Sequence, residues 1–201
     1  MTITIAELSA FCLYAFVTSI TPGPNNAMLA SSGVNFGFYR TLPHILGVSC
    51  GLCLMVLAIG LGLERLFQLY PMLFPLVRVS GACYLIYLAW RIATAVAPSG
   101  DLRGQAVPLG YWGAVIFQWL NPKTWLMAIG AVTAYAPLQY HFRDIALIAL
   151  IFTLINAPCV SAWAACGSML KNRLGQSHRL SMFNRLMAGT LVLSLYPLLV
   201  R

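Results

Sequence analysis

The chain has 201 residues, of which 60% are hydrophobic and only 8% are charged. A soluble domain carries charge on about a quarter of its residues, so the composition excludes an ordinary soluble protein and predicts an all-α integral membrane protein. The net charge of +8 does not indicate binding to nucleic acid, because the basic residues are scattered and gather in short loops, as membrane topology requires.

Six apolar segments predict six transmembrane helices in a single domain, 1–201. The most polar linker, 97–108, divides them into a first three-helix repeat at 1–96 and a second at 109–201. The predicted spans are about Ile5–Phe38, Leu42–Leu63, Met72–Thr94, Leu109–Tyr135, Ile145–Met169 (interrupted at Asn156-Ala-Pro158) and Met182–Leu199.

The first span contains Ser19-Ile-Thr-Pro-Gly-Pro-Asn-Asn26 near its midpoint. Proline removes a backbone donor and glycine lacks the side chain that resists an open backbone, so the helix is expected to break there. Within hydrocarbon, a broken backbone must be satisfied by protein or line a cavity. The break therefore predicts a binding site.

The fourth span contains a second break, at Gln118-Trp-Leu-Asn-Pro-Lys-Thr124. Here Asn121, a good N-cap residue, precedes Pro122, which suits the first helical position. In the first motif Thr21 precedes Pro22 in the same way. Each motif predicts a half-helix that starts within the membrane, and matching breaks in two halves are typical of inverted-repeat transporters.

Lys123 lies about 21 Å along the fourth span, too deep to snorkel easily to the near interface. One interpretation is a fixed cation for a substrate carboxylate, assisted by the amides of Thr124 and Trp125 at the start of the half-helix. The alternative is a lysine that snorkels through a kinked helix or caps a carbonyl.

The first motif offers complementary groups, since the amides of Gly23, Asn25 and Asn26 carry partial positive charge and the asparagine side chains both donate and accept. A small zwitterion fits them, with its carboxylate toward Lys123 and its ammonium toward asparagine and unwound carbonyl oxygens. Alternatively, the two asparagines only cap the broken backbone. The predicted binding residues are Thr21, Pro22, Gly23, Pro24, Asn25, Asn26, Asn121, Pro122, Lys123 and Asn156.

No acidic residue lies near the centre of a span, which argues against a metal or a dicationic substrate and leaves no carboxylate for proton coupling. His44 is the candidate for proton coupling, unless it is simply hydrogen-bonded. Arg78 either anchors a vestibule or snorkels, and Asn156 with Pro158 forms either a polar contact or a kink. No catalytic or cofactor-binding arrangement is found, so we expect neither enzymatic activity nor a cofactor.

The cysteines all fall within predicted spans and are interpreted as core residues. They are Cys12, Cys50, Cys53, Cys83, Cys159 and Cys166. The spacing of Cys50 and Cys53 leaves open a transmembrane thiol/disulfide electron carrier, although the fourth span has no partner cysteine. A non-transporting membrane scaffold is a third alternative, but it leaves the paired breaks and Lys123 unexplained.

The basic residues are unevenly distributed between the two sides of the predicted bundle. One side carries Arg40, Arg91, Arg103, Lys171, Arg173, Arg179 and Arg185. The other carries Arg65, Arg143 and Arg201. The positive-inside rule then predicts that both termini lie outside.

Three stretches, Thr21-Pro-Gly-Pro-Asn25, Leu46-Gly-Val-Ser-Cys-Gly51 and Asn121-Pro-Lys123, resemble the LysE/RhtB family of amino-acid exporters. The resemblance covers essentially the whole chain and is strongest to the branch that exports small neutral amino acids and derivatives, such as cysteine, O-acetylserine, homoserine and threonine. It implies efflux across a bacterial inner membrane, driven by the proton motive force, on a fold of two inverted three-helix repeats. Ala157-Pro158 and His44 depart from the family pattern, and self-association is left open.

Overall fold

The structure, a computed structural model, describes residues 4–63, 69–94, 108–137, 141–171 and 177–195. Every regular element in these ranges is a helix, which confirms the all-α prediction for this part of the chain. The helices are α1 (Ile5–Ile20), α2 (Pro24–Phe36), α3 (Phe38–Ala58) with its π-helical extension η1 (Ile59–Leu63), α5 (Leu73–Ala93), α6 (Tyr111–Leu120), α7 (Pro122–Tyr135), α8 (Phe142–Lys171) and α9 (Ser177–Leu193).

The first predicted break separates α1 from α2, and the two helices are bent by 55°. The expected position of the new helix is wrong by two residues. Thr21 ends α1 instead of capping α2, and Pro24, not Pro22, is the first residue of α2, after an extended Gly23. The buried Asn26 side chain donates to Thr21 O at 2.7 Å, which satisfies the end of α1 and leaves the turn outside both helices.

The second predicted break separates α6 from α7 as expected. Asn121 caps α7, Pro122 is its first residue, and the Asn121 side chain accepts a hydrogen bond from the Lys123 amide at 3.1 Å. This agrees with the usual chemistry of a helix start, in which proline occupies a position whose amide would have no helical partner.

Three other boundaries differ from those expected. The second span starts at Phe38, not Leu42, and contains Pro43. The expected interruption at 156–158 is wrong, because α8 runs continuously through Pro158, as membrane helices allow when neighbouring groups satisfy the freed backbone. The last helix starts at Ser177, and residues 196–199 of the predicted sixth span lie outside the described residues.

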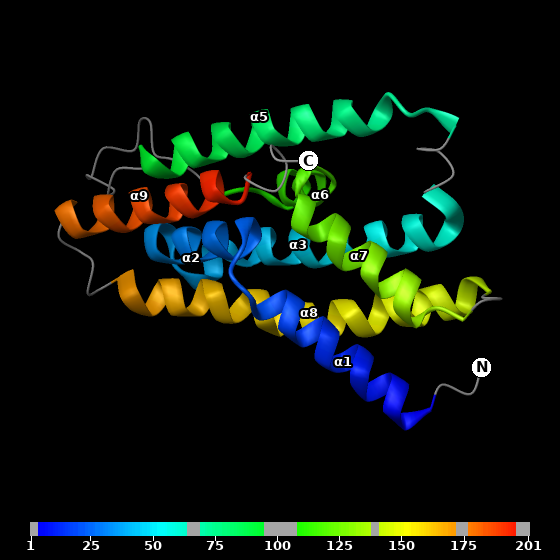
Figure 1. Ribbon diagram of the computed structural model, residues 1–201. Helices are drawn as coiled ribbons and strands as arrows, with labels where there is room; N and C mark the ends of the chain where they lie inside the picture. Colours follow the sequence, from blue (N-terminus) through cyan, green and yellow to red (C-terminus); the bar gives the residue numbers. More distant parts are fainter. Residues whose placement is uncertain (1–3, 64–68, 95–107, 138–140, 172–176, 196–201) are drawn as a thin grey trace.

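Helices α2, α3 and α8 run alongside one another at the centre, α5 and α9 pack together on one side, and α1 and α7 cross the bundle at a tilt (Figure 1). Contact between α2 and α8 is backbone to backbone. A Cβ atom on Gly33 would collide with Ala164 O, and one on Gly167 would collide with Ala30 O. Small residues permit this close approach.

Three described stretches are long and apolar enough to cross a membrane, namely Phe38–Leu63, Pro75–Ala93 and Phe142–Lys171. The bent pair of α1 and α2 makes a fourth if it counts as one span. The fold is therefore that of a multi-pass membrane protein. The six-span inverted repeat stays a prediction, since α6, α7 and α9 are each shorter than a straight span needs.

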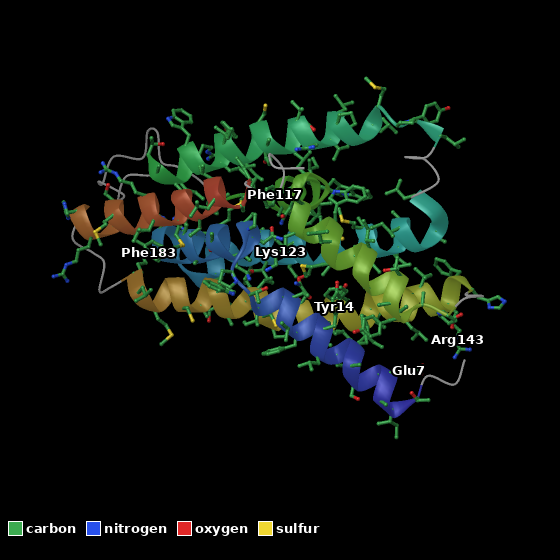
Figure 2. The ribbon with its side chains drawn as sticks, in the orientation of Figure 1. Glu7, Tyr14, Phe117, Lys123, Arg143 and Phe183 are labelled. Carbon is green, nitrogen blue, oxygen red and sulfur yellow. The ribbon has the colours of Figure 1, made fainter. Side chains whose placement is uncertain are left out.

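The two ends of the bundle differ in charge. Glu7 and Arg143 mark one end (Figure 2), where α1 and α8 begin. At the opposite end α2 and α8 end and α3 and α9 begin (Figure 1). Arg40, Arg91, Lys171 and Arg179 lie in terminal turns there, and we call it the basic end.

Candidate functional site

A small central cavity lies between the two broken spans. Its volume is about 20 Å³, roughly the space that one water needs. Both breaks contribute to it, with α3 and α8 completing the wall. The lining residues are Thr18, Ser19, Gly23, Asn25, Asn26, Val48, Leu52, Gln118, Lys123, Thr124, Met127, Asn156 and Val160. An amino acid does not fit in the cavity in this conformation.

Lys123 joins the two breaks. Its Nζ donates to Thr21 O at 2.6 Å and to Thr21 Oγ1 at 2.9 Å, with Pro22 O at 3.4 Å. An ammonium has three donors, and all three acceptors belong to the first break. This is the carbonyl-capping contact that the alternative interpretation of Lys123 predicted, and a carboxylate would have to compete with these acceptors.

The amides at the start of α7 are not free, so their expected role in binding a carboxylate is wrong for this conformation. The amides of Thr124 and Trp125 both donate to Asn121 O, at 3.0 and 3.3 Å. The first break differs. The amides of Asn25 and Asn26 have no acceptor within the described part of the chain, and therefore keep the positive end of α2 available.

Asn25 pairs with Gln118, a residue of the second motif that is absent from the predicted binding set. Asn25 Nδ2 donates to Gln118 Oε1 at 2.7 Å, and Gln118 Nε2 donates back to Asn25 Oδ1 at 3.1 Å. The Thr124 hydroxyl also donates to Gln118 Oε1, at 3.1 Å. Gln118 is fully buried. A polar residue one turn before the Asn121 cap, inside an apolar span, was the signal available in the sequence.

Two more of the predicted asparagines, Asn26 and Asn156, line the same cavity, whereas Asn121 does not. Asn26 caps the broken backbone, since its Nδ2 donates to Ser19 O as well as to Thr21 O. Asn156 makes a polar contact from α8, with Nδ2 donating to Ser19 Oγ at 3.0 Å. Its buried Oδ1 has no hydrogen-bond partner among the described residues, so an acceptor remains for a ligand.

Four aromatic rings, Phe11, Tyr14, Tyr135 and Phe152, form what we call the aromatic barrier. Ring centroids lie 5.1 Å apart for Phe11 and Tyr135 and 5.8 Å apart for Phe11 and Phe152. Tyr14 contacts Tyr135 and Phe152, and its hydroxyl donates to Met127 O at 3.0 Å. Phe11 and Tyr135 also line an outer pocket of about 390 Å³.

The aromatic barrier lies between that outer pocket and the central cavity. Along α1, Phe11 lines the pocket and Thr18 the cavity, with Tyr14 between them. Along α8, Ile148 lines the pocket and Asn156 the cavity, with Phe152 between them. Figure 2 likewise places Tyr14 between Lys123 and the end marked by Glu7 and Arg143. The barrier therefore closes the cavity toward the end opposite the basic end.

Two predicted features lie away from the central cavity. His44 is buried in α3 and lines a different cavity, toward the basic end. Cys50 and Cys53 are partly buried on α3, and the described cysteines are free. The thiol-carrier alternative gains no support from this arrangement.

The Asn25–Gln118 pair yields the first prediction. Gln118→Leu is expected to reduce the free energy of unfolding by about 1–3 kcal/mol, because the half-buried Asn25 amide and the buried Thr124 hydroxyl lose a partner. Denaturation in detergent micelles would measure it. In the Asn25→Leu/Gln118→Leu double variant the loss should fall short of the sum of the single losses by about 0.5–3 kcal/mol. Additive losses would contradict the pairing.

Comparison with known proteins gives a family and two groups of relatives. The family model described as LysE type translocator matches residues 16–196. A cysteine/O-acetylserine efflux protein of Salmonella choleraesuis (strain SC-B67) is 31% identical over 166 residues, covering 82% of this chain and 84% of the relative. The protein of the same description from Escherichia coli (strain K12) is 30% identical over 174 residues, covering 86% and 88%. No solved structure matches the chain.

Proposed function

This chain belongs to the LysE type translocator family, and we propose that it is a secondary transporter that exports a small neutral amino acid or derivative across a bacterial inner membrane. Cysteine and O-acetylserine are the first candidates, since both appear in the names of the relatives. The observation that carries the proposal is Lys123 of one broken span bound to the backbone of the other, at the central cavity.

The cavity offers separate groups to the two charges of a zwitterion. A carboxylate would replace the Thr21 oxygens as the hydrogen-bond acceptor for Lys123. It would also accept hydrogen bonds from the free backbone amides of Asn25 and Asn26. The ammonium would meet Asn156 Oδ1 and the Thr21 carbonyl that Lys123 releases. Binding thus exchanges the partners of Lys123 and does not leave a buried ion unpaired, which would be costly.

A central cavity too small for an amino acid, with the aromatic barrier toward one end, fits an alternating-access cycle in which one end opens at a time. Opening toward the outer pocket requires the aromatic barrier to separate, and this means moving the α1 rings away from Tyr135 of α7 and Phe152 of α8. We propose that one three-helix repeat rocks against the other to do so. The basic end would face the cytoplasm and both termini the outside.

We propose that inward proton flow drives export, with His44 as the group that carries the proton. His44 is 1% exposed and its ring nitrogens have no partner among the described residues. A histidine in such a setting gains or loses a proton only when the conformation admits water or a partner. A transporter that couples export to proton flow requires this link between protonation and conformation.

Uptake into inside-out vesicles tests the exporter proposal. Radiolabelled cysteine or O-acetylserine is expected to accumulate when the vesicle interior is acidified relative to the medium, and accumulation should stop when a protonophore removes the gradient. Correctly inserted protein that transports no member of a panel of small neutral amino acids under either condition would contradict the proposal.

The same vesicles separate transport from thiol chemistry. The Cys50→Ser/Cys53→Ser variant is expected to take up the amino acid at the wild-type rate, because neither thiol lines the central cavity. Loss of uptake in this variant, with normal protein in the membrane, would instead favour the thiol-carrier alternative.

A further inference from the structure

A second polar cavity, which we call the inner cavity, lies between α2, α3 and α5 toward the basic end. Its volume is about 60 Å³, room for several waters or for a small polar group. Ser31, Ser32 and Asn35 line it from α2, His44 from α3 and Arg91 from α5. None of these residues lines the central cavity.

The inner cavity lies next to the central cavity along helices α2 and α3. On α3, Val48 lines the central cavity and His44, four residues earlier, lines the inner cavity. On α2, Asn26 lines the central cavity and Ser31 the inner one. Four residues of helix advance about 6 Å, so a solute in the inner cavity is about one helical turn from the central site.

His44 is the group in the inner cavity that calls for a ligand. It is 1% exposed, and neither Nδ1 nor Nε2 has a hydrogen-bond partner in the described part of the chain. The neighbouring polar groups are already bonded. Asn35 donates to Ser31 O at 2.8 Å and Asn184 Oδ1 at 2.9 Å, and the Ser32 and Thr41 hydroxyls are 2.9 Å apart. A buried polar group without a partner is unfavourable, which indicates that His44 meets one from the cavity.

Arg91 gives the cavity its charge. Its guanidinium carbon lies 5.9 Å from the centroid of the Tyr87 ring, an arrangement that holds a cation over an aromatic face. No acidic residue lies among the described residues that line the cavity. A guanidinium recognises the two oxygens of a carboxylate with two parallel hydrogen bonds, and the imidazole N–H supplies a third donor.

We propose that the inner cavity is a carboxylate-binding site, at which Arg91 and His44 hold the carboxylate of the amino acid before it moves one turn deeper to the central site. The identity of the physiological ligand rests on the proposed exporter function, whereas the carboxylate chemistry does not. The site then selects anionic groups at the basic end, ahead of the step in which Lys123 exchanges its partners.

Acetate, the smallest suitable carboxylate, is the probe, and acetamide is its neutral counterpart. The full-length protein carries three histidines, so a His141→Gln/His178→Gln background labelled with ¹⁵N-histidine leaves His44 as the single reporter. In lipid nanodiscs at fixed pH and ionic strength, acetate is expected to shift the His44 ring signals saturably and acetamide is not. The Lys123→Met variant should give the same acetate shift, since it alters only the central site.

Arg91→Gln is expected to weaken acetate binding by about tenfold or more, and Arg91→Lys by less because its charge remains. Arg40→Gln, which removes an exposed arginine at the same end, is the matched control and should bind acetate as wild type does. Folded protein with no acetate-specific shift, or an Arg91→Gln variant that binds as tightly as Arg40→Gln, would overturn the proposal. Vesicle uptake reports separately on export. Acetate binding without uptake retains the inner site and rejects the exporter, and uptake without acetate binding does the reverse.

Discussion

Lys123→Met is expected to reduce export to the background of protein-free vesicles while the protein reaches the membrane at a near-normal level. Methionine keeps the length and flexibility of the side chain but removes the donors that reach Thr21 and Pro22. A hydrogen bond to a charged group contributes about 1.5–3 kcal/mol. Loss of that contribution at the carboxylate corresponds to about a 10- to 150-fold loss of affinity, to which the loss of the ordered break is added.

Lys171→Met provides the matched control for this variant. Lys171 is the other lysine of the chain, lies exposed at the end of α8, and is distant from the central cavity lining. Its replacement should leave the uptake rate unchanged. If Lys123→Met instead lowers membrane level and export in equal proportion, Lys123 acts only by capping the carbonyls of the first break, and the substrate-binding role fails.

The contacts of Lys123 illustrate where sequence reasoning reaches its limit. Its depth in an apolar span singled it out, because a central charge is unfavourable without a partner. The partner itself, the carbonyl of Thr21, lies about one hundred residues earlier in the chain. Nothing local to the Asn-Pro-Lys motif specifies which backbone Lys123 will meet, so the sequence is compatible with both interpretations of this residue.

The two breaks differ in how well the sequence predicted them, and the reason is local chemistry. Asn121 and Pro122 form a complete helix start by themselves. The Asn121 side chain accepts a hydrogen bond from the amide of Lys123, which is only two residues away in the sequence. At the first break, Pro22 and Pro24 both suit a first helical position. The choice of Pro24 depends on Asn26 reaching back to Thr21 O, a contact that residue order alone does not reveal.

Gln118 and Pro158 show the same limit in opposite directions. The sequence does not identify Gln118 as a site residue, because its partners, Asn25 and Thr124, come from two other helices. Pro158 is exposed, yet α8 continues through it, because one proline removes a single backbone donor and membrane helices tolerate that loss. Propensity describes a residue with its neighbours in sequence, whereas the partners of Gln118 are neighbours in space.

Gly167→Ala is expected to reduce the free energy of unfolding by about 1–3 kcal/mol, the usual effect of overpacking a close-packed interior. The new Cβ would meet the Ala30 carbonyl oxygen, which belongs to the backbone and cannot rotate away. Gly189→Ala is the matched control. Gly189 lies in α9 with no other atom within 4 Å of the added carbon, so that variant should be neutral or stabilised by up to about 1 kcal/mol through helix propensity. Thermal denaturation in detergent would compare the two.

The α2–α8 contact also links stability to the site. Gly33 and Gly167 face each other's helices reciprocally, so once one alanine has separated the backbones the second should add less than its single effect. Separation would also move Asn156 of α8 away from Ser19, which it contacts at 3.0 Å, and would widen the wall of the central cavity. Gly167→Ala should therefore lose export at temperatures where it remains folded, and Gly189→Ala should not. Equal stability of the two variants would mean that α2 and α8 can move apart without a loss of stability. Their close approach would then not be what holds the site together.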